Sequence, residues 1–202
     1  IYEIIVRSSN VGSARLALMV GEKGLKEIFS ILGLLVPVGL ELREANLTQP
    51  IVPKNWRDIT LATVSYGYGV SVSLLHLAKA YAILGNGGYY VEPTILKKNH
   101  DGNRGAKVLK KTTSDEILKL LEAVVTDQRG TARILASKYY RIGGKTGTAE
   151  KISLERKGYQ KDKVVANFVG LFPLQEPRFV IAAFLDEPEN NLLQEPCRYA
   201  SC

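Results

Sequence analysis

The sequence predicts an α+β fold in which a helical region precedes an antiparallel sheet. In the first two-thirds of the chain apolar residues recur at helical spacing, whereas the last third holds three strand-like stretches with short connections. Consecutive strands with short connections pair as an antiparallel meander, and helices first with strands last argues against alternating βαβ units. The 202 residues suffice for one domain with a hydrophobic core.

The N-terminal part predicts two helices followed by a long irregular connection. Asn10 is expected to cap the first helix, which Gly21 and Gly24 then break. The apolar spacing over residues 25–35 predicts the second helix. Prolines, a glycine and mixed polar residues make residues 37–53 an irregular segment.

A third helix is predicted to begin after Ser73 and to end at the glycines of residues 85–88. It is apolar on nearly all sides, so we expect it to be buried. His76 lies on this helix without a cluster of partner residues, and we expect it to be packed rather than to bind a ligand.

Two short strands and a fourth helix are predicted next. Residues 89–96 and 106–111 read as strands around a turn at residues 101–103. Thr113 and Glu116 resemble a capping box that opens an amphipathic helix. The strands of the meander are then predicted over residues 141–151, 164–174 and 178–187.

The net charge of +7, from 27 Lys and Arg against 20 Asp and Glu, suggests anionic partners. The basic residues are scattered, however, and form no extended run with interleaved aromatic residues. We therefore expect no nucleic-acid binding, and we attribute most of the charge to a solvated surface.

The sequence predicts no metal site and no cofactor. Cys197 and Cys202 lack metal-ligand spacing with the two histidines, His76 and His100. No run of eighteen apolar residues occurs, so no membrane span is predicted, and no signal peptide is apparent.

The stretch "YYRIGGKTGTAEKI" at residues 139–152 admits two interpretations. Gly144-Lys145-Thr146 could end a phosphate-binding P-loop, but that motif requires a glycine where Tyr139 stands and a helix after the lysine. The residues that follow are charged and are broken by a glycine instead. Lys145-Thr146-Gly147 matches the Lys-Thr-Gly motif of serine acyl-transfer enzymes, which lies on a strand. The second interpretation is favoured.

Ser8-Ser9-Asn10 supplies a Ser-x-Asn motif upstream of Lys-Thr-Gly, which is the order found in those enzymes. The surrounding blocks "SYGYGVSVSLLHLAKAYAILGNGG", "GTA", "KTGTAE" and "EPRFVIAAFLDEP" are more specific. Together they resemble the class B penicillin-binding proteins, and most closely the septal, cell-division peptidoglycan D,D-transpeptidases. The resemblance covers residues 1–188 as a partial transpeptidase domain and leaves residues 189–202 as an unmatched C-terminal tail.

The resemblance implies a partial penicillin-binding or serine β-lactamase-like transpeptidase fold, with three of the sheet strands present. It also implies catalytic roles for Ser8 as a proton relay, Asn10 as a holder of a substrate amide and Lys145 as a cation in the proton network. From the residues alone, Ser8 and Asn10 could instead end one helix and cap another, and Lys145 could be an exposed strand lysine.

The resemblance further implies that Thr146, Gly147 and Thr148 bind substrate. The two threonine hydroxyls would bind the terminal carboxylate, and the Thr148 N–H would belong to the oxyanion hole. Gly147 would let the substrate backbone lie close to the strand edge, although a glycine there could also mark a β-bulge. We interpret Tyr66 and Tyr68 of "SYGYG" as aromatics that shape a pocket or a core rather than as catalytic groups.

One family motif is missing from this sequence. The family nucleophile lies in Ser-x-x-Lys, and no serine here has a lysine three residues later. We expect the nucleophile to lie outside this chain, and the chain alone to be inactive and unstable. Two further interpretations remain open: a non-catalytic split or degenerate relative that acts in binding, and a related D,D-carboxypeptidase or β-lactamase.

The resemblance implies as partners the D-Ala-D-Ala end of the peptidoglycan stem peptide, β-lactams, other cell-division proteins and the missing N-terminal part of the same protein. It implies a location at the periplasmic face of the bacterial inner membrane.

Overall fold

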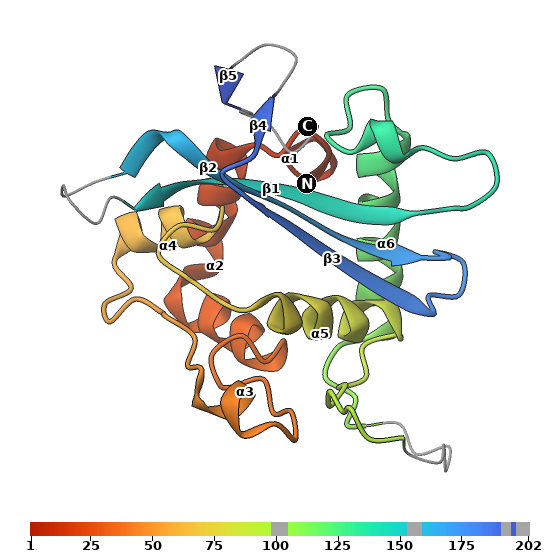
Figure 1. Ribbon diagram of the computed structural model, residues 1–202, viewed down its shortest axis with the longest axis horizontal. Coiled ribbons are helices and arrows are strands. Elements are labelled where there is room, and N and C mark those ends of the chain that lie inside the picture. The colour runs from red at the N-terminus through yellow and green to blue at the C-terminus, as the bar shows by residue number, and fades with distance from the viewer. Residues whose placement is uncertain (98–104, 153–158, 191–194, 197–202) are drawn as a thin grey trace.

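The computed structural model describes residues 1–97, 105–152, 159–190 and 195–196, and it confirms the α+β class (Figure 1). The helices, one 3₁₀ turn and the strands follow one another as α1 (Tyr2–Val6), α2 (Asn10–Ile31), α3 (Arg43–Leu47), α4 (Asp58–Val64), α5 (Leu74–Gly85), α6 (Lys111–Thr126), η1 (Arg133–Leu135), β1 (Gly143–Ile152), β2 (Tyr159–Phe172), β3 (Phe179–Asp186), β4 (Glu189–Asn190) and β5 (Glu195–Pro196).

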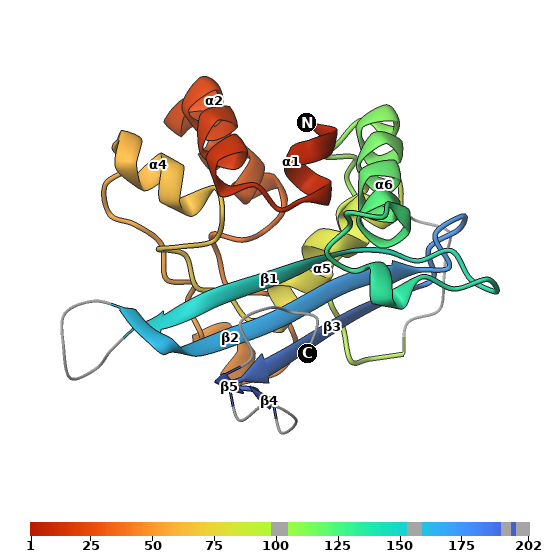
Figure 2. The ribbon, with the colours of Figure 1, turned by 90° about the horizontal axis from the view of Figure 1, so that it is seen from above.

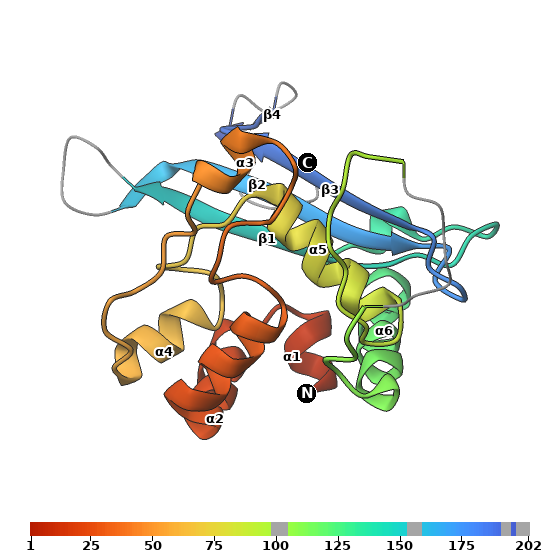
Figure 3. The same ribbon diagram turned by 90° about the horizontal axis from the view of Figure 1, so that it is seen from below.

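The predicted meander is present as an antiparallel sheet in the order β1-β2-β3. Its register pairs Lys145 with Val169 and Val169 with Ala182, so these three residues share one face. Helices α1, α2, α4 and α6 lie together on one side of the sheet (Figures 2 and 3). The short β4-β5 hairpin is separate from the main sheet.

The core between the sheet and helices α5 and α6 is built around Leu171 of β2. Its buried partners are Leu121 of α6 and Leu174, and Tyr81 of α5 packs against the same cluster. Each fully buried leucine contributes about 2 kcal/mol through removal of apolar surface from water. This cluster fixes the middle of the sheet against both helices and so holds β1 in place. A separate cluster of Trp56, Leu61 and Val64 anchors α4 to α2.

The opposite face of β3 is apolar and exposed. Phe179 and Ile181 are 56% and 55% exposed, and Leu185 is exposed as well. These alternate residues point to the same side of the strand, so together they form an uncovered apolar strip.

The first long helix differs from the prediction in its cap. Ser9, rather than Asn10, is the N-cap: its hydroxyl accepts a hydrogen bond from the Gly12 N–H at 3.2 Å, and Asn10 is the first helical residue. Gly21 breaks the helix as predicted, with φ 74° and ψ 175°. Gly24 does not, because it lies inside the helix that continues after the break.

The helix after Ser73 is confirmed, and the structure shows in addition a side-chain cap that was not predicted. The Ser73 hydroxyl accepts from the His76 N–H, and the His76 side chain accepts from the Ser73 N–H, which makes a reciprocal capping box. His76 is packed as expected: it is 1% exposed, and its Nε2 lies 2.9 Å from the carbonyl oxygen of Val36.

Three other local predictions were wrong. Helix α6 begins at Lys111 and has no side-chain cap, so Thr113 and Glu116 form no capping box. The hydroxyl of Ser114 instead donates a hydrogen bond to the Leu84 carbonyl of α5.

Residues 89–96 and 106–111 form a single bridge between Tyr89 and Lys107 rather than two strands. The turn expected at residues 101–103 lies outside the described residues. Within residues 37–53, predicted to be irregular, the structure forms the short helix α3.

Across the described ranges, the helices lack the combined length and apolar character that a membrane crossing requires.

Candidate active site

The two motifs that lie farthest apart in the sequence meet at β1. Lys145 Nζ donates a hydrogen bond to Ser8 Oγ at 2.9 Å across 137 positions of the chain. Lys145 comes from the middle of β1, and Ser8 lies in the short link between α1 and α2. Figure 2 shows α1 between α2 and α6, on the helical side of β1. Gly144-Lys145-Thr146 lies within a regular strand, which agrees with the rejection of a P-loop.

Ser8 has an unusual backbone conformation. Its φ of 53° lies in the left-handed region, which residues other than glycine rarely adopt and which costs about 1–3 kcal/mol. The conformation ends α1 and immediately precedes the Ser9 cap of α2. The tight link between the two helices therefore holds the Ser8 hydroxyl against the lysine.

Lys145 is a partly buried lysine whose environment makes the ammonium form less stable than it is in water. Burial lowers the pKa of Lys145 from 10.5 to about 8. Its Nζ also donates to the carbonyl oxygen of Thr146 at 2.9 Å, and it lies 3.4 Å from Thr146 Oγ1. At pH 7 the ammonium form still predominates, but it releases its proton far more easily than a solvated lysine. The pair can therefore move a proton between nitrogen and hydroxyl oxygen near neutral pH.

Thr131 extends this hydrogen-bond chain. Thr146 Oγ1 donates to Thr131 Oγ1 at 2.7 Å. Thr131 lies in the turn after α6, which is tight because a Cβ on Gly130 would come within 2.2 Å of the Val124 carbonyl oxygen. "GTA" contributed to the resemblance, but no role was predicted for its threonine. The turn brings that residue back over β1, which local sequence patterns do not reveal.

Gly147 packs against the side chain of its neighbour on β2. It pairs with Asn167, and a Cβ at Gly147 would lie 2.6 Å from Asn167 Oδ1. The register is regular through Gly147, and its shift falls between Glu150 and Lys151. The alternative that Gly147 marks a bulge was therefore wrong.

The edge of β1 away from β2 carries the remaining predicted residues. The Glu150 N–H donates to the Tyr68 hydroxyl rather than to β2, and backbone N–H groups of a strand alternate between its two edges. The N–H groups of Thr146 and Thr148 therefore point to this same outer edge. Their side chains share one face of β1, and that of Thr148 is exposed.

Asn10 is exposed at the first position of α2. Among the described residues, the structure gives its side chain no hydrogen bond to Ser8 or Lys145. The predicted residues thus divide: Ser8, Lys145 and Thr146 are joined by hydrogen bonds, Gly147 and Thr148 continue the same strand, and Asn10 stands beside them.

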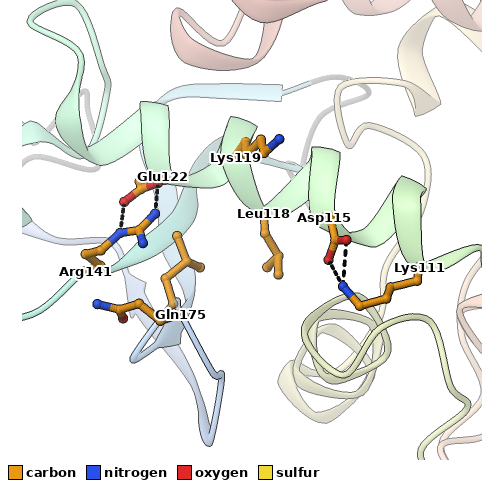
Figure 4. A pocket seen from close by; sticks show the side chains of 8 residues that line it. Lys111, Asp115, Leu118, Lys119, Glu122, Arg141 and Gln175 are labelled. Carbon is orange, nitrogen blue, oxygen red and sulfur yellow. Dashed lines mark hydrogen bonds and ion pairs between the residues drawn. The ribbon is translucent and has the colours of Figure 1, made fainter.

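A separate pocket of about 330 Å³ lies between α6 and the start of β1 (Figure 4). Four of its five charged side chains are paired: Lys111 binds Asp115 at 2.7 Å, and Arg141 binds Glu122 through two hydrogen bonds of 2.6 and 2.7 Å. The Arg141 hydrogen bonds lower the pKa of Glu122. None of the predicted catalytic or substrate-binding residues lines this pocket, so it is distinct from the candidate active site.

Comparison with known proteins agrees with this geometry. Residues 1–197 match the penicillin binding protein transpeptidase domain. The probable peptidoglycan D,D-transpeptidase FtsI of Caulobacter vibrioides is 37% identical over 196 residues, which are 94% of this chain and 33% of that protein. The chain therefore spans about a third of the length of this relative.

Solved structures give the same result. The apo transpeptidase domain of Burkholderia pseudomallei penicillin-binding protein 3 superimposes with a TM-score of 0.83 at 38% identity, covering 93% of this chain and 56% of that one. Penicillin-binding protein 3 of Mycobacterium tuberculosis, complexed with aztreonam, gives 0.82 at 28% identity, covering 98% and 48%. The Ser-x-Asn and Lys-Thr-Gly motifs are in contact, and the family matches residues 1–197 of the 202 residues of this chain. This chain therefore belongs to the penicillin-binding protein transpeptidases.

Proposed function

We propose that this chain is the substrate-binding part of a class B peptidoglycan D,D-transpeptidase, which cross-links stem peptides by serine acyl transfer. The 2.9 Å hydrogen bond between Lys145 and Ser8 carries the proposal. It joins a lysine whose pKa is about 8 to a hydroxyl in a strained link, beside a strand with an outward-facing edge. The 202 residues hold no Ser-x-x-Lys, so the attacking serine belongs to another part of the protein.

In this mechanism Lys145 and Ser8 handle the proton of the acylation step. The attacking serine gives its own proton to a base outside this chain, and the nitrogen of the leaving amine needs a proton when the C–N bond breaks. Ser8 Oγ–H donates it, and the Lys145 ammonium replaces the proton on Ser8 through the existing hydrogen bond. A lysine with a pKa near 8 can give up this proton and regain it at neutral pH.

The outer edge of β1 binds the substrate. The N–H of Thr148 faces that edge and serves as one oxyanion-hole donor, a role worth about 3 kcal/mol in acyl-transfer enzymes. Thr146 and Thr148 offer hydroxyls to the terminal carboxylate of the stem peptide. Gly147, which has no side chain, lets the substrate backbone lie close to the strand edge, and Asn10 holds a substrate amide with its exposed side chain.

The ligands of this site are the D-Ala-D-Ala end of the stem peptide and β-lactams. One similar solved protein, penicillin-binding protein 3 of Mycobacterium tuberculosis, is complexed with the β-lactam aztreonam, which supports the assignment. From the sequence resemblance to septal transpeptidases we further propose that the protein acts in cell division, contacts other division proteins and faces the periplasm from the inner membrane. From the sequence blocks we place the end of the transpeptidase part at residue 188 and assign residues 189–202 to a C-terminal tail, while the family match itself runs to residue 197.

Fluorescent penicillin tests the proposal. We define the extended protein as residues 1–202 preceded by a segment of the same family that contains Ser-x-x-Lys. The extended protein is expected to be labelled covalently, and Ser8→Ala is expected to slow labelling by about a hundredfold. Residues 1–202 alone are expected to remain unlabelled. An extended protein that resists labelling although it is folded would refute the function, and labelling of residues 1–202 alone would refute the position of the nucleophile.

A further inference from the structure

The "SYGYG" loop, residues 65–69, places Tyr68 against the end of β1, the strand whose outer edge is proposed to bind substrate. The Tyr68 hydroxyl accepts a hydrogen bond from the Glu150 N–H at 3.1 Å, across 82 positions of the chain. The loop follows α4, whose buried residues Leu61 and Val64 belong to the Trp56 cluster. The end of β1 is thereby tied to a well-packed part of the helical region.

The conformation of this loop is fixed by glycines and backbone hydrogen bonds. Gly67 and Gly69 have φ of 100° and 83°, which only glycine adopts without strain, so Tyr68 is held between two sharp turns. The Tyr68 N–H donates to the Thr63 carbonyl at 3.1 Å. The ring of Tyr66 packs edge-on against that of Tyr68, with centroids 5.8 Å apart. Tyr68 is therefore oriented before any ligand arrives.

The Glu150 N–H is the last regular donor on the outer edge of β1. The register with β2 shifts directly after it, between Glu150 and Lys151. On this edge the donors of Thr146 and Thr148 precede it, and the phenol oxygen occupies the position that a third residue of a paired peptide would need. An extended ligand can thus pair with β1 as far as Thr148 and no farther.

We propose that Tyr68 is a positioning residue of the transpeptidase site: its hydroxyl ends the substrate-binding edge at Glu150 and thereby holds the Thr148 N–H at its place in the oxyanion hole. This inference rests on the proposed function. Tyr68 is assigned no proton transfer in it; its hydroxyl oxygen serves as the acceptor for the Glu150 N–H. Its effect reaches the reaction only through the geometry of β1.

The test is Tyr68→Phe in the extended protein, which removes the hydroxyl and keeps the ring. Tyr66→Phe is the matched control, since it changes the partner ring in the same way and leaves the Glu150 hydrogen bond intact. We expect Tyr68→Phe to lower the rate constant of penicillin acylation by about tenfold, the usual effect of one lost hydrogen bond. Its non-covalent affinity for penicillin should stay within about twofold of wild type, and Tyr66→Phe should acylate at the wild-type rate.

Amide hydrogen exchange at Glu150 gives a readout independent of activity. We expect exchange of the Glu150 N–H to accelerate in Tyr68→Phe and to be unchanged in Tyr66→Phe. Unchanged protection of Glu150 in Tyr68→Phe would overturn the inference, and so would acylation at the wild-type rate. Equal losses of acylation in both tyrosine variants, in parallel with their melting temperatures, would also overturn it. If the wild-type extended protein is not acylated at all, the proposed function fails, and the exchange measurement still decides the role of Tyr68.

Discussion

Lys79 and Lys145 are both withdrawn from solvent, and their surroundings differ. Lys79 of α5 is 4% exposed; its Nζ donates to the Tyr90 hydroxyl at 2.6 Å and to the Val38 carbonyl at 3.3 Å, and lies 4.5 Å from the centre of the Tyr90 ring. Lys145 faces the hydroxyl of Ser8 at the edge of a strand. Neither forms an ion pair with an acidic side chain in the described part of the chain.

The comparison shows that burial of a lysine is a poor sign of catalysis by itself. The partners of Lys79 are a backbone carbonyl and a phenol that join α5 to two loops, so this ammonium group stabilises the fold. The partners of Lys145 can exchange a proton, and the strand beside it presents backbone donors to a ligand. What separates the two sites is the chemistry of the partner and its access to an open edge.

The largest effect is expected from removal of the lysine at the strand edge. Lys145→Ala in the extended protein should reduce the rate of penicillin acylation by about a thousandfold, because the proton of Ser8 is no longer replaced. Its free energy of unfolding should fall little, since the variant removes a partly desolvated charge. Acylation kinetics and urea unfolding measure the two quantities, and activity above a tenth of wild type would contradict the assignment.

The next effect concerns Gly147, which lies on the same strand. Gly147→Ala should reduce acylation by about tenfold and destabilise the protein by about 1–3 kcal/mol, because the new methyl group meets the side chain of Asn167. Asn167→Gly in the same chain opens that space and should restore most of the stability. A single Gly147→Ala variant with normal unfolding would show that Asn167 moves aside freely.

For Lys79, in contrast to Lys145, we expect a loss of stability and no loss of acylation. Lys79→Met keeps the side-chain volume but leaves the Tyr90 hydroxyl and the Val38 carbonyl without their donor, at a cost of about 1–2 kcal/mol. Acylation by the folded protein should be unchanged. A strong loss of acylation with normal stability would contradict the assignment of Lys79 to a structural role and of Lys145 to proton transfer.

The last prediction is a pH dependence of stability, which should leave acylation of the folded protein at neutral pH unaffected. The folded pKa of Lys145, about 8, lies below the unfolded value of 10.5, so between these pH values the unfolded chain binds more protons. The free energy of unfolding should therefore gain a contribution that rises from pH 8 to pH 10.5. The difference between wild type and Lys145→Met, measured by urea unfolding at both ends of this range, isolates that contribution; Lys79→Met serves as the control variant. A difference that stays constant with pH would contradict the lowered pKa.

The sequence predicted those features that depend on neighbouring residues. The strands of the meander, the break at Gly21 and the helix after Ser73 follow from local patterns of apolar and glycine residues, and all three are present. The capping box at Thr113 failed because the first turn of α6 packs against α5, where Ser114 bonds the Leu84 carbonyl. Tertiary packing, rather than local propensity, sets that helix start.

The candidate site was predictable only where motifs mark it. Ser8 and Lys145 were named from the Ser-x-Asn and Lys-Thr-Gly triplets, and the structure brings them together. The contribution of Thr131 depends on a turn that brings it over β1, and the close packing at Gly147 depends on Asn167 of the next strand. Contacts of this kind arise from register and chain reversal, which a single sequence does not display.

A double-mutant cycle on the Lys145–Ser8 pair tests the central claim most directly. The acylation rate of the extended protein is measured for wild type, Ser8→Ala, Lys145→Ala and the double variant. If the two side chains act as one proton-transfer unit, the double variant should be no slower than the slower single variant. Losses that multiply in the double variant would show that the two residues act independently, and would contradict the proposed proton relay.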